Sequence, residues 1–157
     1  MIEFGIPQNR REQARFLLFK ILSDCYILMV KTQNYHWNVR GPHFHSYHQM
    51  LGTQYDDLAE AVDMLAERIR TLGFHVSAHY KNFVTQATLE EEMGEPDTEE
   101  MLKNLTDDHE YLIREIREAI GKLKETEDEG TTDLLVERLR VHEKTAWFLR
   151  NHLCDYA

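Results

Sequence analysis

Proline occurs at only three positions in this chain, and the long segments between them carry apolar residues at helical spacing. The prolines are Pro7, Pro42 and Pro96. Each fixes φ and removes a backbone donor, so a long helix avoids all three. Apolar side chains three or four residues apart form one face of a helix, and such spacing covers about residues 11–37, 47–72, 97–124 and 131 or 132 to 153. The sequence therefore predicts four long helices.

Local signals indicate where three of these helices begin or end. The turn Arg40-Gly41-Pro42 ends the first helix, because proline disfavours helical geometry in the residue before it and glycine accepts unusual dihedral angles. Gly73 ends the second helix. The third opens with Asp97 as a candidate N-cap and Glu100 three residues later, a spacing typical of a capping box.

Residues 74–96 have no sustained period and form a long connection, in which Tyr80, Phe83 and Val84 could make a short helix. A connection of this length could cross the bundle and place the second and third helices parallel. The predicted fold is therefore all-α: a ferritin-like four-helix bundle with a long crossover that carries a short helix. A simple up-and-down bundle stays open, because periodicity does not distinguish the two topologies.

The length of 157 residues is that of a single domain. We expect one domain over residues 1–157, with a short N-terminal extension of about residues 1–10. The apolar content of 42% excludes a disordered chain. No charge-free apolar run approaches the roughly 18 residues of a membrane span, and residues 1–11 contain no signal-like segment. We therefore expect a cytoplasmic protein.

Acidic residues outnumber basic ones, and histidines are numerous. The formal net charge of −10 repels phosphate backbones and favours cations as partners. Nine histidines are present, and neutral imidazole binds transition metals. Cys25 and Cys154 have no zinc-finger spacing and are too few for a disulfide framework, so we expect reduced thiols. Metal binding is therefore the first function to consider.

The chain does not follow the pattern of a metal centre inside a four-helix bundle. Such a di-iron centre usually takes Glu-x-x-His pairs from facing helices, and this sequence contains none. Asp63 and Glu67 lie four residues apart on the predicted second helix, so their carboxylates share one face and could clasp a cation. The alternative for this pair is a solvated acidic patch, which is common on helix surfaces.

Two histidines flank the first turn. His36 ends the first helix and His48 lies in the first turns of the second, so both could point into one pocket. His48 and Asp63 are fifteen residues apart on one helix, which is about 22 Å at helical rise. A single site would therefore need a second subunit, with two copies of this helix antiparallel across a two-fold axis. The alternative for each histidine is an ordinary hydrogen-bonded imidazole.

The local sequence around these residues resembles the signature of Dps-type miniferritins, the DNA-protecting proteins of starved cells. The resemblance covers most of the chain and is carried by Tyr35-His36-Trp37-Asn38-Val39-Arg40-Gly41, Phe44, His48, Asp63, Ala66-Glu67-Arg68, Leu72-Gly73, Thr132-Asp133-Leu134-Leu135, His142-Glu143-Lys144 and Trp147. A match at these offsets is specific, whereas a bare His-Trp pair would mean little.

The resemblance implies a hollow dodecamer that oxidises Fe(II), preferably with hydrogen peroxide, stores the ferric product and protects the cell against oxidative damage. By residue match, His36 would join Asp63 and Glu67 of the partner subunit on the first iron, and His48 would serve the second. These four residues are the candidate catalytic and metal-binding residues. Trp37 would donate an electron to stray radicals or serve as an interface aromatic.

The chain departs from the family at one position. The family normally carries an acidic residue one turn after the second histidine, where this chain has Gly52. The second iron would then be held more weakly, be completed by water, or recruit His45 or Asp56. An acidic residue restored at position 52 should not harm the helix unless the missing side chain makes room for a neighbour. A histidine-enriched site would also bind Zn²⁺.

Three acidic residues near the start of the fourth helix, Asp128, Glu129 and Asp133, could line a three-fold entry pore for Fe²⁺ as in the family, or be solvated charges. DNA binding in the family often uses lysine-rich tails, and residues 1–11 and 151–157 contain no lysine, so we expect weak DNA binding. The competing functions are a DNA-compacting architectural protein and a Zn²⁺-binding shell with little iron turnover.

Overall fold

All secondary structure in the described part of the chain is helical. The computed structural model describes residues 2–3 and 5–153, so the expectation for Cys154 lies outside the described residues. None of the described helices is long and apolar enough to cross a bilayer. The helices in chain order are α1 (Gln8–Asn38), α2 (Phe44–Thr71), α3 (Tyr80–Gln86), α4 (Thr98–Leu123) and α5 (Glu129–Arg150).

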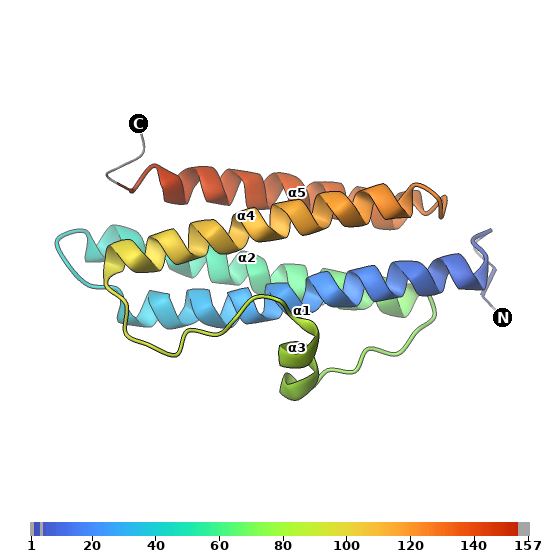
Figure 1. The fold of residues 1–157 in the computed structure, drawn as a ribbon, viewed down its shortest axis with the longest axis horizontal. Helices are drawn as coiled ribbons and strands as arrows, with labels where there is room; N and C mark the ends of the chain where they lie inside the picture. The colour runs from blue at the N-terminus through green and yellow to red at the C-terminus, as the bar shows by residue number, and fades with distance from the viewer. Residues whose placement is uncertain (1, 4, 154–157) are drawn as a thin grey trace.

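The four long helices form two antiparallel hairpins that pack side by side. The first hairpin is α1 with α2, and the second is α4 with α5 (Figure 1). The segment between α2 and α4 returns along the length of the bundle and carries α3 on the outer side of α1. Helices α2 and α4 consequently run in the same direction. The ferritin-like bundle with a long crossover is therefore confirmed, and the simple up-and-down alternative is wrong.

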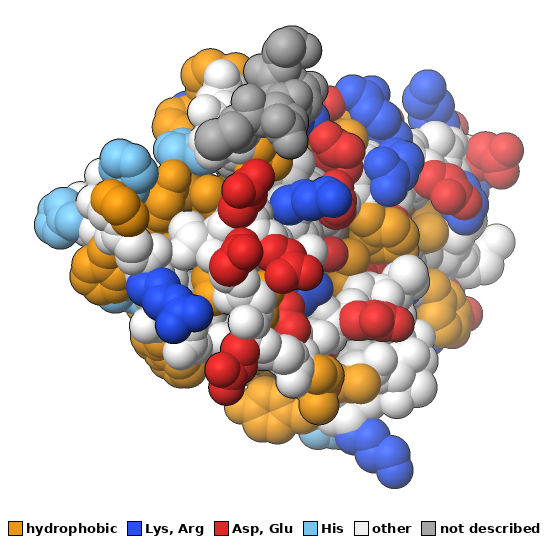
Figure 2. Space-filling model, turned by 60° about the vertical axis from the view of Figure 1, so that its left-hand side comes forward, with side chains coloured by type: hydrophobic (Ala, Val, Ile, Leu, Met, Phe, Trp, Pro, Cys, Tyr) orange, Lys and Arg blue, Asp and Glu red, His pale blue; other side chains and the backbone are white. Residues whose placement is uncertain are grey.

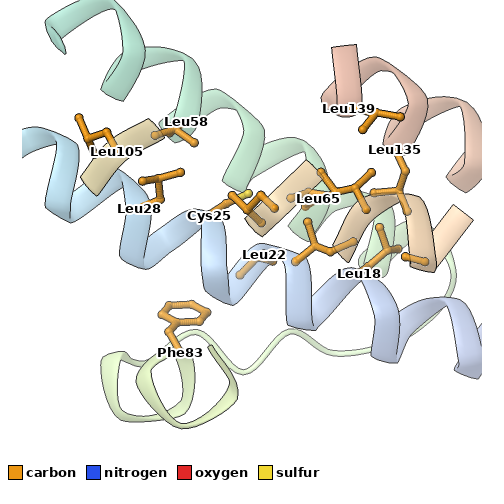
Figure 3. Close-up of a cluster of buried hydrophobic side chains, with 14 of the residues drawn as sticks. Leu18, Leu22, Cys25, Leu28, Leu58, Leu65, Phe83, Leu105, Leu135 and Leu139 are labelled. Atoms are coloured by element: carbon orange, nitrogen blue, oxygen red, sulfur yellow. The ribbon is translucent and has the colours of Figure 1, made fainter. Parts of the chain in front are cut away.

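The apolar stripes of the four long helices meet in one core. Leucines dominate this core, and Cys25 lies among them as a buried free thiol, whose pKa burial raises to about 12 (Figure 3). Fully burying one leucine side chain contributes about 1.5–3 kcal/mol. The labelled core residues that are 1% exposed or less are Leu18, Leu22, Cys25, Leu28, Leu58, Leu65, Leu105 and Leu135.

A buried carboxylate fixes the crossover to α1. Asp24 is fully buried, and its Oδ1 atom accepts the backbone N–H groups of Thr88 at 2.7 Å and Leu89 at 2.8 Å. Lys20 pairs with the same carboxylate. Phe83 of α3 stacks on Tyr26 of α1 at a centroid distance of 4.4 Å. The segment after α2 is thus held across the bundle by one ionic anchor and one aromatic anchor.

Three helix starts differ from the sequence prediction and one agrees with it, and α2 begins at Phe44, three residues before the predicted spacing. Asp97 caps α4 by accepting the Glu100 N–H at 2.9 Å, as predicted. Helix α5 begins two or three residues early, because Asp128 Oδ1 accepts the Thr131 N–H at 3.0 Å. Helix α1 begins at Gln8, directly after Pro7, so the N-terminal extension is shorter than about ten residues.

The role expected for Asp128 needs correction. Its side chain is buried, caps α5 and accepts a hydrogen bond from Arg68 Nη2 at 2.7 Å. A carboxylate so enclosed is a structural group and not the solvated charge that the sequence allowed. Glu129 and Asp133 are exposed.

Candidate metal centre

The turn between α1 and α2 brings two imidazole rings into contact. His36 comes from the last turns of α1 and His48 from the first turns of α2. Their ring centroids lie 3.8 Å apart at an interplanar angle of 15°, so the rings stack. Phe44 stacks on the outer side of His48 at 5.1 Å, and Tyr55 meets the His36 ring edge-on at 5.2 Å. The sequence prediction that the side chains of His36 and His48 come together is therefore correct.

Hydrogen bonds fix which nitrogen of each ring is available. His36 Nδ1 lies 2.6 Å from the His48 carbonyl oxygen, and His48 Nδ1 lies 2.8 Å from the His36 carbonyl oxygen. A carbonyl oxygen only accepts, so each Nδ1 carries the proton and donates it. The Nε2 atom of each ring then keeps its lone pair in the neutral form. This is the state in which histidine binds a metal, with the other nitrogen held by a carbonyl group.

The two candidate carboxylates lie elsewhere on α2. Asp63 and Glu67 are both exposed and share one face of the helix four residues apart. Helix α2 is continuous between them and His48, so Asp63 is about 22 Å along the axis from His48. Among residues 2–3 and 5–153, no three His, Cys, Asp or Glu side chains come together to hold a metal. One subunit therefore presents an imidazole pair and a carboxylate pair at separate places.

Gly52 lies directly under the His36 ring. A Cβ atom built on Gly52 would be 3.0 Å from His36 Cε1 and 3.3 Å from His36 Nδ1, closer than ordinary van der Waals contact. The sequence interpretation treated Gly52 as a missing carboxylate that could make room for a neighbour, and the His36 imidazole of the neighbouring helix occupies that room. His45 and Asp56, the two expected substitutes for a missing ligand, are exposed.

Aromatic side chains lie exposed beside the imidazole pair. Trp37 is 66% exposed and Phe44 is 44% exposed. Figure 2 looks toward the end of the bundle where α1 meets α2, and histidine and hydrophobic side chains lie together on its left-hand side. Large apolar groups exposed on one subunit are typical of a surface that a partner covers.

A second polar group lies inside the bundle and was missed by the sequence interpretation. Arg138 of α5 is 2% exposed and donates to both carboxylate oxygens of Asp57, at 3.2 and 3.0 Å. Its Nη2 atom also lies 3.3 Å from His142 Nε2, and His142 Nδ1 lies 2.9 Å from His109 Nδ1. These four side chains form one chain of hydrogen bonds from α2 through α5 to α4. We call it the buried relay.

The protonation states along the buried relay follow from its donors. Arginine only donates, so His142 accepts at Nε2, carries its proton on Nδ1 and donates it to His109. His109 is then protonated at Nε2, and this atom has no hydrogen-bond partner among the described residues. Burial, reinforced by the Arg138 charge, lowers the pKa of His109 to about 3. Burial and the neighbouring groups also lower the pKa of His142 well below its usual value.

The signal for the buried relay was present in the sequence as polar residues at core positions. His109 and His142 occupy the apolar stripes of α4 and α5, and Arg138 precedes His142 by one turn. Spacing alone does not tell which partner a buried polar residue meets. The buried relay is therefore a finding of the structure.

Comparison with known proteins decides the family. A family model described as a ferritin-like domain matches residues 17–156. DNA protection during starvation protein 2 of Bacillus anthracis is 31% identical over 142 residues, which cover 90% of this chain and 97% of that protein. The chain belongs to the Dps-type miniferritins. An uncharacterized low temperature-induced protein of Nostoc sp. is also similar, with 40% identity over 154 residues, 97% of this chain and 86% of that protein.

Solved structures agree with the assignment of this chain to the miniferritins. The structure of DpsC from Streptomyces coelicolor superposes with a TM-score of 0.94 at 31% identity and covers 99% of this chain and 91% of that one. Ferritin-like proteins of the Dps type bind and store iron, protect against oxidative damage and assemble from identical subunits.

Proposed function

We propose that this miniferritin oxidises Fe(II), preferably with hydrogen peroxide, at a centre shared by two subunits, and stores the ferric product inside a dodecameric shell. Each centre takes His36 and His48 from one subunit, and Asp63 and Glu67 from the partner subunit. The observation that carries the proposal is the pair of imidazoles whose Nδ1 atoms are held by carbonyl groups while both Nε2 atoms stay available. The exposed carboxylate pair about 22 Å away along α2 supports a shared centre.

Two-fold symmetry supplies the missing half of each site. If two α2 helices run antiparallel across a two-fold axis, the start of one helix lies beside the middle of the other. The imidazole pair of each subunit then faces the carboxylate pair of its partner, and every such interface holds two equivalent centres. The exposed Trp37 and Phe44 beside the imidazoles would be covered by the same contact. Trp37 would also be placed to give an electron to a stray radical.

The side chains have distinct tasks in the reaction. The imidazole Nε2 atoms of His36 and His48 bind Fe²⁺ as neutral ligands, and the carboxylates of Asp63 and Glu67 offset the charge that grows on oxidation. Two Fe²⁺ ions held together each give one electron to hydrogen peroxide, whose O–O bond breaks, and two protons complete two water molecules. Pairing the electrons in this way avoids the one-electron step that releases a hydroxyl radical. Glu129 and Asp133 would attract Fe²⁺ toward an entry pore.

A second candidate function is a shell that holds Zn²⁺ with little iron turnover. The stacked imidazoles favour it, because two nitrogen ligands suit borderline metals, and Gly52 brings no carboxylate to the second ion. Wild-type protein that binds Zn²⁺ tightly and fails to oxidise Fe(II) would support this candidate against the first.

Mixed assemblies test the shared centre. Subunits that carry His36→Ala and His48→Ala, and subunits that carry Asp63→Ala and Glu67→Ala, should each lose most rapid Fe(II) oxidation with peroxide in stopped-flow absorbance. When the two kinds are co-expressed with different tags and purified together, random pairing restores about a quarter of the centres. Asp107→Ala, an exposed acid of α4, is the matched control and should keep the wild-type rate. No recovery in mixed assemblies, or unchanged rates in the Asp63 and Glu67 variant, would contradict the proposal.

A further inference from the structure

We infer that Gly52 is a positioning residue of the imidazole pair, because its missing side chain is what allows the His36 ring to stack on His48. The role of this contact in metal binding rests on the proposed function, whereas the contact itself rests on the geometry of one subunit. Gly52 lies on α2 one turn after His48. A Cβ atom there would approach His36 Cε1 to 3.0 Å and Nδ1 to 3.3 Å.

Three contacts hold the His36 ring in its place. His48 stacks on it at 3.8 Å, and Tyr55 meets it edge-on at 5.2 Å. Its Nδ1 atom is held by the His48 carbonyl oxygen at 2.6 Å. A side chain at position 52 would therefore displace the ring, lengthen this hydrogen bond and separate the stack.

The displacement would reach the second histidine as well. His48 Nδ1 donates to the main-chain oxygen of His36, so each ring is anchored to the other residue's backbone, and the stacking contact at 3.8 Å couples the two rings. A shift of His36 that disturbs this arrangement would redirect both Nε2 atoms. Gly52 therefore acts on both imidazoles through one contact, without touching a metal itself.

The same contact sets the class of metal that the site prefers. A carboxylate at position 52 would add a hard oxygen ligand, but its Cβ atom requires a different His36 orientation. The chain consequently keeps two oriented nitrogen ligands in place of one nitrogen and one additional oxygen. Borderline ions such as Fe²⁺, Co²⁺ and Zn²⁺ gain from this choice over harder ions such as Mn²⁺ and Mg²⁺.

A double-mutant cycle tests the contact without any metal. Gly52→Ala is compared by thermal unfolding in the wild-type and His36→Ala backgrounds, because alanine favours a helix over glycine when nothing obstructs it. We expect the melting temperature to rise in the His36→Ala background and to fall, or stay level, in the wild type. Gly121→Ala is the matched control, since Gly121 of α4 has no atom within 4 Å of its built Cβ, and it should raise both. An equal rise from Gly52→Ala in both backgrounds would overturn the inference.

Anaerobic Co²⁺ titration of the assembled protein tests the consequence for metal binding. Gly52→Ala should lower Co²⁺ affinity at least about tenfold, as loss of an orienting contact does, and should alter the visible d–d spectrum. Gly52→Asp should shift the ratio of affinities from Co²⁺ toward Mn²⁺. Gly121→Ala should keep both the affinity and the spectrum. Unchanged Co²⁺ binding in Gly52→Ala would overturn the inference, whereas a wild type that binds Co²⁺ without oxidising Fe(II) would overturn only the proposed function.

Discussion

Mild acid should destabilise this protein through the two buried histidines of the relay. His109 stays neutral in the folded subunit, where burial and the Arg138 charge lower its pKa to about 3. In the unfolded chain the same group has a pKa near 6.5. The contribution of His109 to stability is therefore fully present above pH 6.5 and is lost as the pH falls toward 3.

The size of this loss follows from the difference in proton uptake. Between pH 7 and pH 5 the unfolded chain takes up a proton on His109 and the folded chain does not. The interval of about 1.5 pH units below 6.5 corresponds to about 2 kcal/mol of free energy of unfolding. His142 contributes in the same direction, because its pKa is also lowered. Glu115 opposes both, since burial raises its pKa to about 7 and the folded state then binds the proton more readily.

Urea unfolding at fixed protein concentration measures the effect. The free energy of unfolding is compared at pH 7 and pH 5 for the wild type, His109→Gln and the exposed control His75→Gln. Glutamine keeps a hydrogen-bonding amide and removes the ionisable ring, so the pH-dependent loss should shrink by about 2 kcal/mol in His109→Gln only. Other titrating groups such as Glu115 are common to all three proteins and cancel in the comparison. Losses in the wild type and His109→Gln that agree within about 0.5 kcal/mol would refute the reasoning.

Two further predictions concern the crossover and DNA. Asp24→Ala should lower the free energy of unfolding by about 2–3 kcal/mol, because the buried acceptor of two hydrogen bonds is lost, and should speed hydrogen exchange at the amides of Thr88 and Leu89. Unchanged exchange at these two amides would show that Asp24 does not hold the crossover. DNA should show little or no retardation in a gel near 150 mM salt, because the subunit charge is −10 and residues 1–11 contain only two basic side chains. A strong complex that persists as salt is raised would contradict this expectation.

The helices could be predicted from the sequence where the determining chemistry is local. The apolar stripes of the long helices could be predicted from the spacing of leucines alone. The cap of α4 could be predicted from Asp97 and the residue three positions later. The start of α5 was placed too late, because Asp128 is a buried cap whose second partner is Arg68, sixty residues away in the chain. Long-range partners of this kind leave no trace in local spacing.

The candidate metal centre also has features that local sequence predicts and one that depends on a long-range contact. The meeting of His36 and His48 could be predicted because a short turn joins their helices, and the distance from His48 to Asp63 follows from helical rise alone. The metal-binding roles of these residues remain predictions. Gly52 was interpreted as a missing ligand, with room for a neighbour left open, because a sequence does not show which side chain of another helix lies against a glycine.

The reciprocal bonds between His36 and His48 restrict how this part of the chain can evolve. Each imidazole is oriented by the main-chain oxygen of the other, and one of them covers Gly52. An acidic residue at position 52 would disturb the His36 ring and its stack on His48, unless an earlier change moves that ring. Glycine at position 52 and the stacked pair are therefore coupled, and the order in which substitutions arise at these positions decides which of them the fold tolerates.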